Sequence, residues 1–193
     1  MRPMNFYYAV EVTVAVEDAV LVLLGDRSRS AFEVWQEHTR IFAGTWRVDI
    51  RRVMDAVAKL ERSGLVHVEP ATRARQTSGN RRACQLTPAG RRRQAEWLLG
   101  VTPDIGIEDM YIRGMLAVDA ADPATFEAFR ATSLTCVEKR IKDLGPTKAT
   151  DLVVGATVAF DREVARALAR WLRALPRHRP PRSASVPDAE ITA

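Results

Sequence analysis

This sequence of 193 residues has few cysteines, few histidines and no long apolar run. Its two cysteines, Cys84 and Cys136, are too few for a disulfide framework and fit a reducing compartment, so we expect a cytoplasmic protein. The three histidines lie far apart, without metal-ligand spacing to each other or to a cysteine. No apolar run approaches the roughly 20 residues that cross a bilayer. Acidic residues interrupt the apolar start, so no signal peptide is predicted.

Sequence motifs of common enzyme classes are also missing. The chain contains no Gly-rich phosphate loop, no G-x-S-x-G nucleophile elbow and no H-E-x-x-H zinc motif. The adjacent carboxylates Glu108 and Asp109 would point in different directions on a helix, where they favour its N-terminal dipole. We therefore expect a protein that is not an enzyme and that holds no metal ion or cofactor.

Positive charge is concentrated between residues 45 and 93. This segment holds twelve Lys and Arg against four Asp and Glu, a net charge of +8. The whole chain carries +5, so the remaining residues sum to −3. A local basic surface of this kind indicates a phosphate-backbone partner such as DNA. With 47% hydrophobic residues, the chain can still form a core.

The first 44 residues predict two helices and one ambiguous element. Apolar residues alternate over residues 6–14, which indicates a short strand or the start of a helix running on to Leu24. Residues 17–24 predict a short helix closed by Gly25. Ser30 and Glu33 form a capping box that opens a helix ending near Phe42.

Residues 45–100 predict a recognition helix and a wing. Asp49 is a good N-cap, and Gly64 stops the helix that follows it. Two strands, 65–69 and 82–86, precede a helix that begins at Thr87-Pro88 and ends at Gly100. The apolar residues of the recognition helix recur at helical spacing and are Ile50, Val53, Met54, Val57 and Leu60. This order of elements is typical of a winged helix-turn-helix.

The second half predicts three helices, over residues 107–120, 123–144 and 148–175. The last helix has a long apolar stripe that faces either its neighbours or a second copy of the chain. The stripe consists of Val153, Ala156, Phe160, Val164, Ala167, Leu168, Trp171 and Leu175. We predict a DNA-binding domain over residues 1–100, a helical dimerisation domain over 101–176 and a disordered tail over 177–193. The fold class is mainly α with a small antiparallel β-wing.

The recognition helix and the wing carry the candidate DNA contacts. Arginine can make two hydrogen bonds to guanine, and a carboxylate can accept from cytosine N4. The candidates near the major groove are Arg47, Arg51, Arg52, Asp55 and Lys59. Wing arginines are better placed for phosphates or the minor groove. They are Arg73, Arg75, Arg81 and Arg82. Alternatively, these arginines form a solvated face or pair with Asp49, Asp55 and Glu61.

Several of these motifs resemble the PadR family of bacterial transcriptional regulators. The matching residues are Leu60-Glu61, Gly64-Leu65-Val66, Arg81-Arg82, Leu86-Thr87-Pro88-Ala89-Gly90, Trp97-Leu98 and the preceding Trp46. The resemblance is best over residues 16–99. The chain departs from the family at Ala31-Phe32 in place of Gly-Tyr and at Met54-Asp55 in place of Tyr-Pro. It also has Cys84 where tyrosine is common. The family's tyrosine is associated with a DNA backbone contact, which the chain at Met54 cannot make in the same way.

The resemblance implies a homodimeric repressor that binds a pseudo-palindromic operator. It also implies release by a small aromatic or amphipathic effector near the dimer interface. Aromatic residues that could line such an effector site are Trp35, Trp97, Tyr111 and Trp171. They could equally be ordinary core anchors.

Two further alternatives concern single features of the sequence. Cys84 is either a redox switch, with a thiolate favoured by Arg81 and Arg82, or a small core residue, which strand alternation favours. Cys136 lies beside the apolar residues Leu134, Val137 and Ile141 and is also expected to be buried. The Met54-Asp55 pair also leaves open a winged-helix interaction module that does not read DNA sequence.

Overall fold

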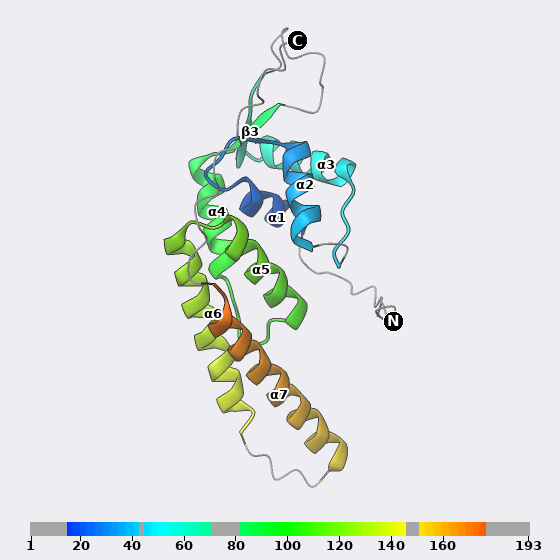
Figure 1. Cartoon of the computed structure of the whole chain (residues 1–193), viewed down its shortest axis with the longest axis vertical. Coiled ribbons are helices and arrows are strands. Elements are labelled where there is room, and N and C mark those ends of the chain that lie inside the picture. Colours follow the sequence, from blue (N-terminus) through cyan, green and yellow to red (C-terminus); the bar gives the residue numbers. More distant parts are fainter. Residues whose placement is uncertain (1–14, 43–44, 71–81, 146–150, 177–193) are drawn as a thin grey trace, which may run out of the picture.

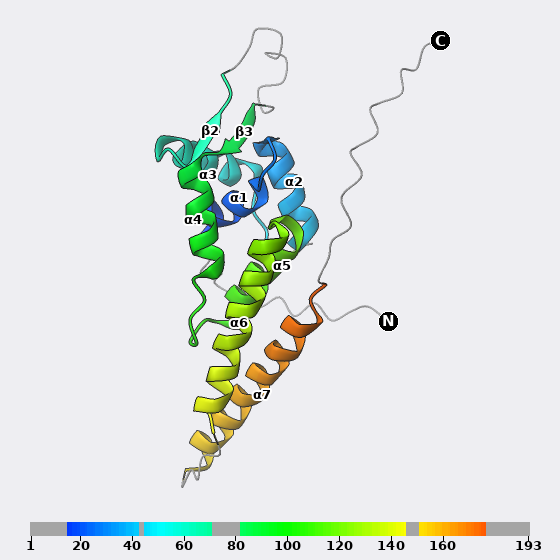
Figure 2. The ribbon, with the colours of Figure 1, turned by 90° about the vertical axis from the view of Figure 1, so that its left-hand side faces the viewer.

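The computed structural model describes residues 15–42, 45–70, 82–145 and 151–176. The described chain is mostly helical, with one small sheet (Figure 1). This confirms the predicted fold class. In two perpendicular views, the hairpin formed by the last two helices projects away from the rest of the chain (Figures 1 and 2). The elements are α1 (Val16–Leu24), β1 (Arg29–Ser30), α2 (Ala31–Phe42), α3 (Ile50–Arg62), β2 (Val66–Val68), β3 (Ala83–Leu86), α4 (Pro88–Leu99), α5 (Ile107–Ala120), α6 (Pro123–Asp143) and α7 (Leu152–Ala174). The element predicted for residues 6–14 and the tail predicted for 177–193 lie outside the described residues.

The helix starts follow the side-chain caps expected from the sequence. The Asp49 carboxylate accepts the backbone N–H of Arg52 at 2.9 Å, which satisfies an otherwise free amide at the start of α3. The capping box of α2 is closed from both sides. The Ser30 backbone N–H donates to the Glu33 carboxylate at 2.7 Å, and the Glu33 N–H donates to the Ser30 hydroxyl at 3.3 Å. These local contacts fix where the two helices of the helix-turn-helix begin.

The sheet has three antiparallel strands in the order β1-β3-β2. Its register pairs Cys84 of β3 with both Val68 of β2 and Arg29 of β1. The two predicted strands are present but shorter, and β1 was not predicted. A two-residue strand is too short to show the alternation by which strands are recognised. The sheet therefore joins the base of the wing, β2 and β3, to strand β1, which directly precedes α2.

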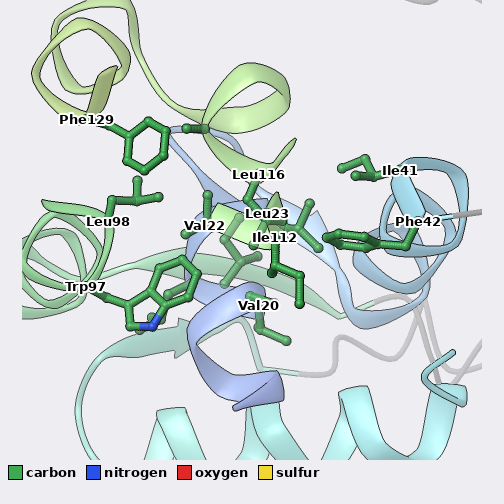
Figure 3. Packing of buried hydrophobic residues seen from close by; sticks show 14 of the residues in the cluster. Val20, Val22, Leu23, Ile41, Phe42, Trp97, Leu98, Ile112, Leu116 and Phe129 are labelled. Atoms are coloured by element: carbon green, nitrogen blue, oxygen red, sulfur yellow. The ribbon is translucent and has the colours of Figure 1, made fainter. Parts of the chain in front are cut away.

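Helix α1 lies at the centre of the core. Its residues 19–24 are all at most 1% exposed, because α2, α3, α4 and α5 pack around it. In Figure 3, Val22 and Leu23 of α1 lie beside Leu116 and Ile112 of α5. Helix α5 therefore shares the core of the preceding helices, although it belongs to the segment predicted as the dimerisation domain.

Two glycines allow other parts of the chain to pack closely against a helix. Gly90 admits the backbone of Leu65, and Gly114 admits the ring of Trp171. A Cβ at Gly90, in the Leu-Thr-Pro-x-Gly motif, would overlap the backbone of Leu65. The Thr87 hydroxyl donates to Gly64 O at 2.7 Å and accepts the Gly90 N–H at 3.1 Å. Through these contacts, the motif packs the start of α4 directly against the turn that follows α3. Gly114 of α5 similarly gives room to the ring of Trp171 on α7.

Helix α7 is buried in its second half and exposed in its first. Leu168, Ala169 and Leu172 are at most 9% exposed. In contrast, Leu152 is 91%, Val153 is 74% and Phe160 is 67% exposed. The single chain therefore covers only part of the predicted apolar stripe. Within the described ranges, no helix is both long and apolar enough to cross a membrane.

Candidate nucleic-acid interface

Helix α3 presents one buried face and one outward face. Val53, Ala56, Val57 and Leu60 are buried against the core. The opposite face is exposed and carries Arg51, Asp55, Ala58 and Arg62. The prediction that Met54 belongs to the buried stripe was wrong, because its side chain is 40% exposed and Ala56 takes the inward position. Arg62 was not among the predicted contacts, although its place one turn beyond Ala58 and two turns beyond Asp55 puts it on the same face.

The turn that leads into α3 is anchored by two tryptophans. Trp46 is 9% exposed, and its ring lies 4.7 Å from the His38 ring and 5.1 Å from the Phe42 ring. The Trp35 indole N–H donates to the backbone carbonyl of Val48 at 3.0 Å. Because Trp46 and Val48 are buried, the side chain between them, Arg47, is held outward. Trp35 was predicted as an effector contact, and the structure places it where it positions the recognition helix.

The three arginines around the start of α3 are exposed. In the part of the chain that the structure describes, no ion pair joins Arg47, Arg51 or Arg52 to a carboxylate. The Asp49 carboxylate accepts a backbone N–H instead. These guanidinium groups therefore remain available to an anionic partner.

Lys59 differs from the other candidates because it is held by α1. Its ammonium group lies 2.6 Å from the Glu17 carboxylate, and this hydrogen bond lowers the pKa of Glu17 below its usual value. With a side chain that is 65% exposed, Lys59 still contributes positive charge to the flank of α3. An exposed pair of this kind adds only about 0–1 kcal/mol to stability.

The base of the wing, formed by β2 and β3, lies beside α3. Arg82 is exposed and its guanidinium donates through Nε to the Glu69 carbonyl at 2.8 Å, across from β3 to the end of β2. The three other wing candidates, Arg73, Arg75 and Arg81, lie outside the described residues. In Figure 2, β2 and β3 stand at the same end of the molecule as α3.

The remaining aromatic candidates lie around α5 rather than in one cluster. Tyr111 and Trp171 are brought together, with ring centroids 6.2 Å apart. Trp97 is 7% exposed and lies under the Arg113 guanidinium, which is 4.4 Å from its ring centroid. Trp35 is apart from them on α2.

Burial also shifts the pKa of two charged side chains near Trp97. It lowers the pKa of Arg113 and raises that of nearby Asp18, whose carboxylate pairs with Arg93 at 3.0 Å.

The cysteines and titratable side chains do not form a reactive or metal-binding centre in the described segments. Cys84 is 2% exposed, and burial raises the pKa of its thiol to about 11, which disfavours a reactive thiolate. Cys136 is only half-buried and donates to Val101 O at 3.3 Å, so the prediction that it is buried was wrong. No group of three or more His, Cys, Asp or Glu in these segments is placed to hold a metal ion.

No protein-family model and no curated protein matches the chain. Solved structures do. The structure of Bacillus subtilis PadR in complex with operator DNA is 14% identical, covers 84% of this chain and 96% of its own, and has a TM-score of 0.41. The PadR-like transcriptional regulator BC1756 from Bacillus cereus is 17% identical, with 81% and 93% covered and a TM-score of 0.36.

Bacillus subtilis PadR in complex with p-coumaric acid is 14% identical, with 83% and 96% covered and a TM-score of 0.38. All three are PadR or PadR-like proteins. This is the family that the sequence motifs resemble.

Proposed function

We propose that this protein is a DNA-binding transcriptional regulator of the cytoplasm, and specifically a homodimeric repressor. The observation that carries the proposal is the group of exposed arginines around the start of α3. Arg51 and Arg52 on α3 and Arg47 in the turn before it are exposed, without a carboxylate partner in the described residues, next to the base of an arginine-rich wing. Arginines of this kind suit guanine edges in the major groove and the phosphates beside them.

Residues 1–100 carry the proposed DNA-binding elements, and residues 101–176 the proposed dimerisation surface. Support for the dimer comes from the first half of α7, where Leu152, Val153, Val154 and Phe160 are all more than half exposed. Large apolar side chains gathered on one helix are costly to leave in water and mark an interaction surface. A two-fold dimer would read a pseudo-palindromic operator with half-sites about one helical turn apart.

An effector would act by favouring one dimer geometry over another. A ligand that binds more tightly to the geometry that does not fit the operator shifts the population toward it and releases the DNA. Tyr111 and Trp171 support this proposal, because they meet where the projecting hairpin joins α5. Trp97 lies on another side of α5, and Trp35 supports the recognition helix, which favours a structural role for both.

A second candidate function is an interaction module that has lost sequence readout. The exposed Met54-Asp55 pair favours it, because neither side chain is suited to phosphate contact. Replacing Arg51 and Arg52 by alanine distinguishes the two. A DNA reader loses affinity and operator preference, whereas an interaction module retains the binding of its partner.

Binding to the DNA upstream of the protein's own gene, against a scrambled duplex at two salt concentrations, tests the proposal. Specific sites are typically bound roughly a thousandfold or more tightly than other DNA. A clear preference for the upstream duplex supports a sequence-reading regulator. Equal binding to both that collapses with salt contradicts readout at this site, because generic phosphate attraction has that signature.

A further inference from the structure

Asp55 is an acidic residue at the centre of a basic surface. It lies on the outward face of α3 between Arg51, one turn earlier, and Arg62, two turns later. The side chain is exposed. A carboxylate here lowers the affinity of the whole surface for phosphates, since it repels them and cancels one neighbouring positive charge.

No structural role of Asp55 offsets this cost. The N-cap of α3 is Asp49, and a carboxylate in the middle of a helix gains nothing from the helix dipole. Among the residues that the structure places, none forms an ion pair or hydrogen bond with Asp55. Lys59, four residues later and its natural helical partner, pairs with Glu17 instead. Arg51 precedes Asp55, which is the weaker orientation for a helical ion pair.

We propose that Asp55 selects a base, by accepting a hydrogen bond from the N4 amino group of a cytosine in the major groove. This inference rests on the proposed DNA-binding function. A carboxylate only accepts hydrogen bonds, and the major groove offers amino donors on cytosine and adenine. On adenine the N6 donor lies beside the N7 acceptor, which repels a carboxylate, so cytosine is the better partner.

Arg51 provides the second half of the pattern. One helical turn separates it from Asp55, a rise of about 6 Å for four residues. Successive base pairs are about 3.4 Å apart, so the two side chains reach positions roughly two base steps apart. Arg51 suits guanine O6 and N7, so each operator half-site should contain a guanine and a cytosine at this spacing.

Selection of bound duplexes from a randomised pool tests the inference, using the full 193-residue chain and three variants. Asp55→Ala should lose preference at one C·G position, by about 5- to 150-fold, and keep the other positions. Asp55→Asn should shift the preferred base there from cytosine to adenine, since an amide pairs with N6 and N7 of adenine. Glu61→Gln is the control. It removes an exposed charge from the same helix on the flank toward the sheet, where Glu61 acts on the Cys84 thiol.

A single-atom test follows from the selected site. Replacing the preferred cytosine by 2-pyrimidinone removes only the N4 amino group and should weaken wild-type binding as much as Asp55→Ala does. The Asp55→Ala variant should not respond to that replacement. Circular dichroism checks that all variants fold, which the exposure of both side chains leads us to expect.

Two outcomes overturn the inference in distinguishable ways. If Asp55→Ala and Glu61→Gln raise affinity for all duplexes equally and leave the base preferences unchanged, Asp55 only repels phosphates, and the proposed regulator function stands without it. If the wild-type chain selects no sequence at all, the proposed function fails together with the inference.

Discussion

Replacing Leu116 by alanine tests whether α5 belongs to the core built around α1. The Leu116 side chain is 0% exposed and lies against Val22 and Leu23 of α1 (Figure 3). Substitution of a fully buried leucine by alanine removes transfer energy and leaves a cavity, which together cost about 2–5 kcal/mol. This is a large part of the roughly 5–15 kcal/mol that holds a typical domain together.

Urea unfolding at equal protein concentration gives the measurement. With a slope of about 1–3 kcal/mol per molar urea, a loss of about 3 kcal/mol moves the midpoint down by roughly 1–3 M. The control is Ile107→Ala on the same helix, where the side chain is 41% exposed and the change should stay within about 1 kcal/mol. If Leu116→Ala destabilises the chain no more than this control, α5 is not part of the core and the reasoning fails.

Three further predictions concern the helix cap, a buried histidine and the exposed part of α7. Asp49→Ala should lower the free energy of unfolding by about 1 kcal/mol, measured by urea titration, whereas Asp55→Ala should leave it nearly unchanged. Burial lowers the pKa of His38 from 6.5 to about 4, so the unfolded chain binds the extra proton and stability should fall as pH drops from about 6.5 to 4. Thermal unfolding of His38→Phe should lose that part of the pH dependence, and an unchanged slope contradicts the assignment. Phe160→Glu should convert the proposed dimer to a folded monomer in light scattering, because it places a charge on a side chain that is 67% exposed and apolar.

The starts of α2 and α3 were predictable from the sequence because they depend on contacts within three residues. The Asp49 cap and the Ser30–Glu33 box are contacts of this kind, and both are present. Strand β1 was not predictable, since its two residues pair with β3 more than fifty positions away. The burial of Ala56 in place of Met54 depends on which neighbours α3 meets, and helical periodicity alone admits both.

The candidate site was predictable to a similar extent. The exposure of Arg51 and Arg52 follows from their place opposite the apolar stripe. The partner of Lys59 does not, because Glu17 lies 42 residues earlier and only the packing of α1 on α3 brings the two together. The role of Trp35 was equally hidden, since its hydrogen bond to Val48 spans 13 residues.

The close fit of the Trp171 ring against Gly114 places a contact with α5 near one end of the long helix α7. Trp171 lies near one end of α7, and Leu152 begins the other end, about 29 Å away at 1.5 Å per residue. A tilt of about 10° at the tryptophan ring would move the far end of α7 by roughly 5 Å. A small rearrangement at residue 114 would therefore be magnified into a movement of several ångströms at the exposed apolar side chains near the start of α7, such as Leu152 and Phe160.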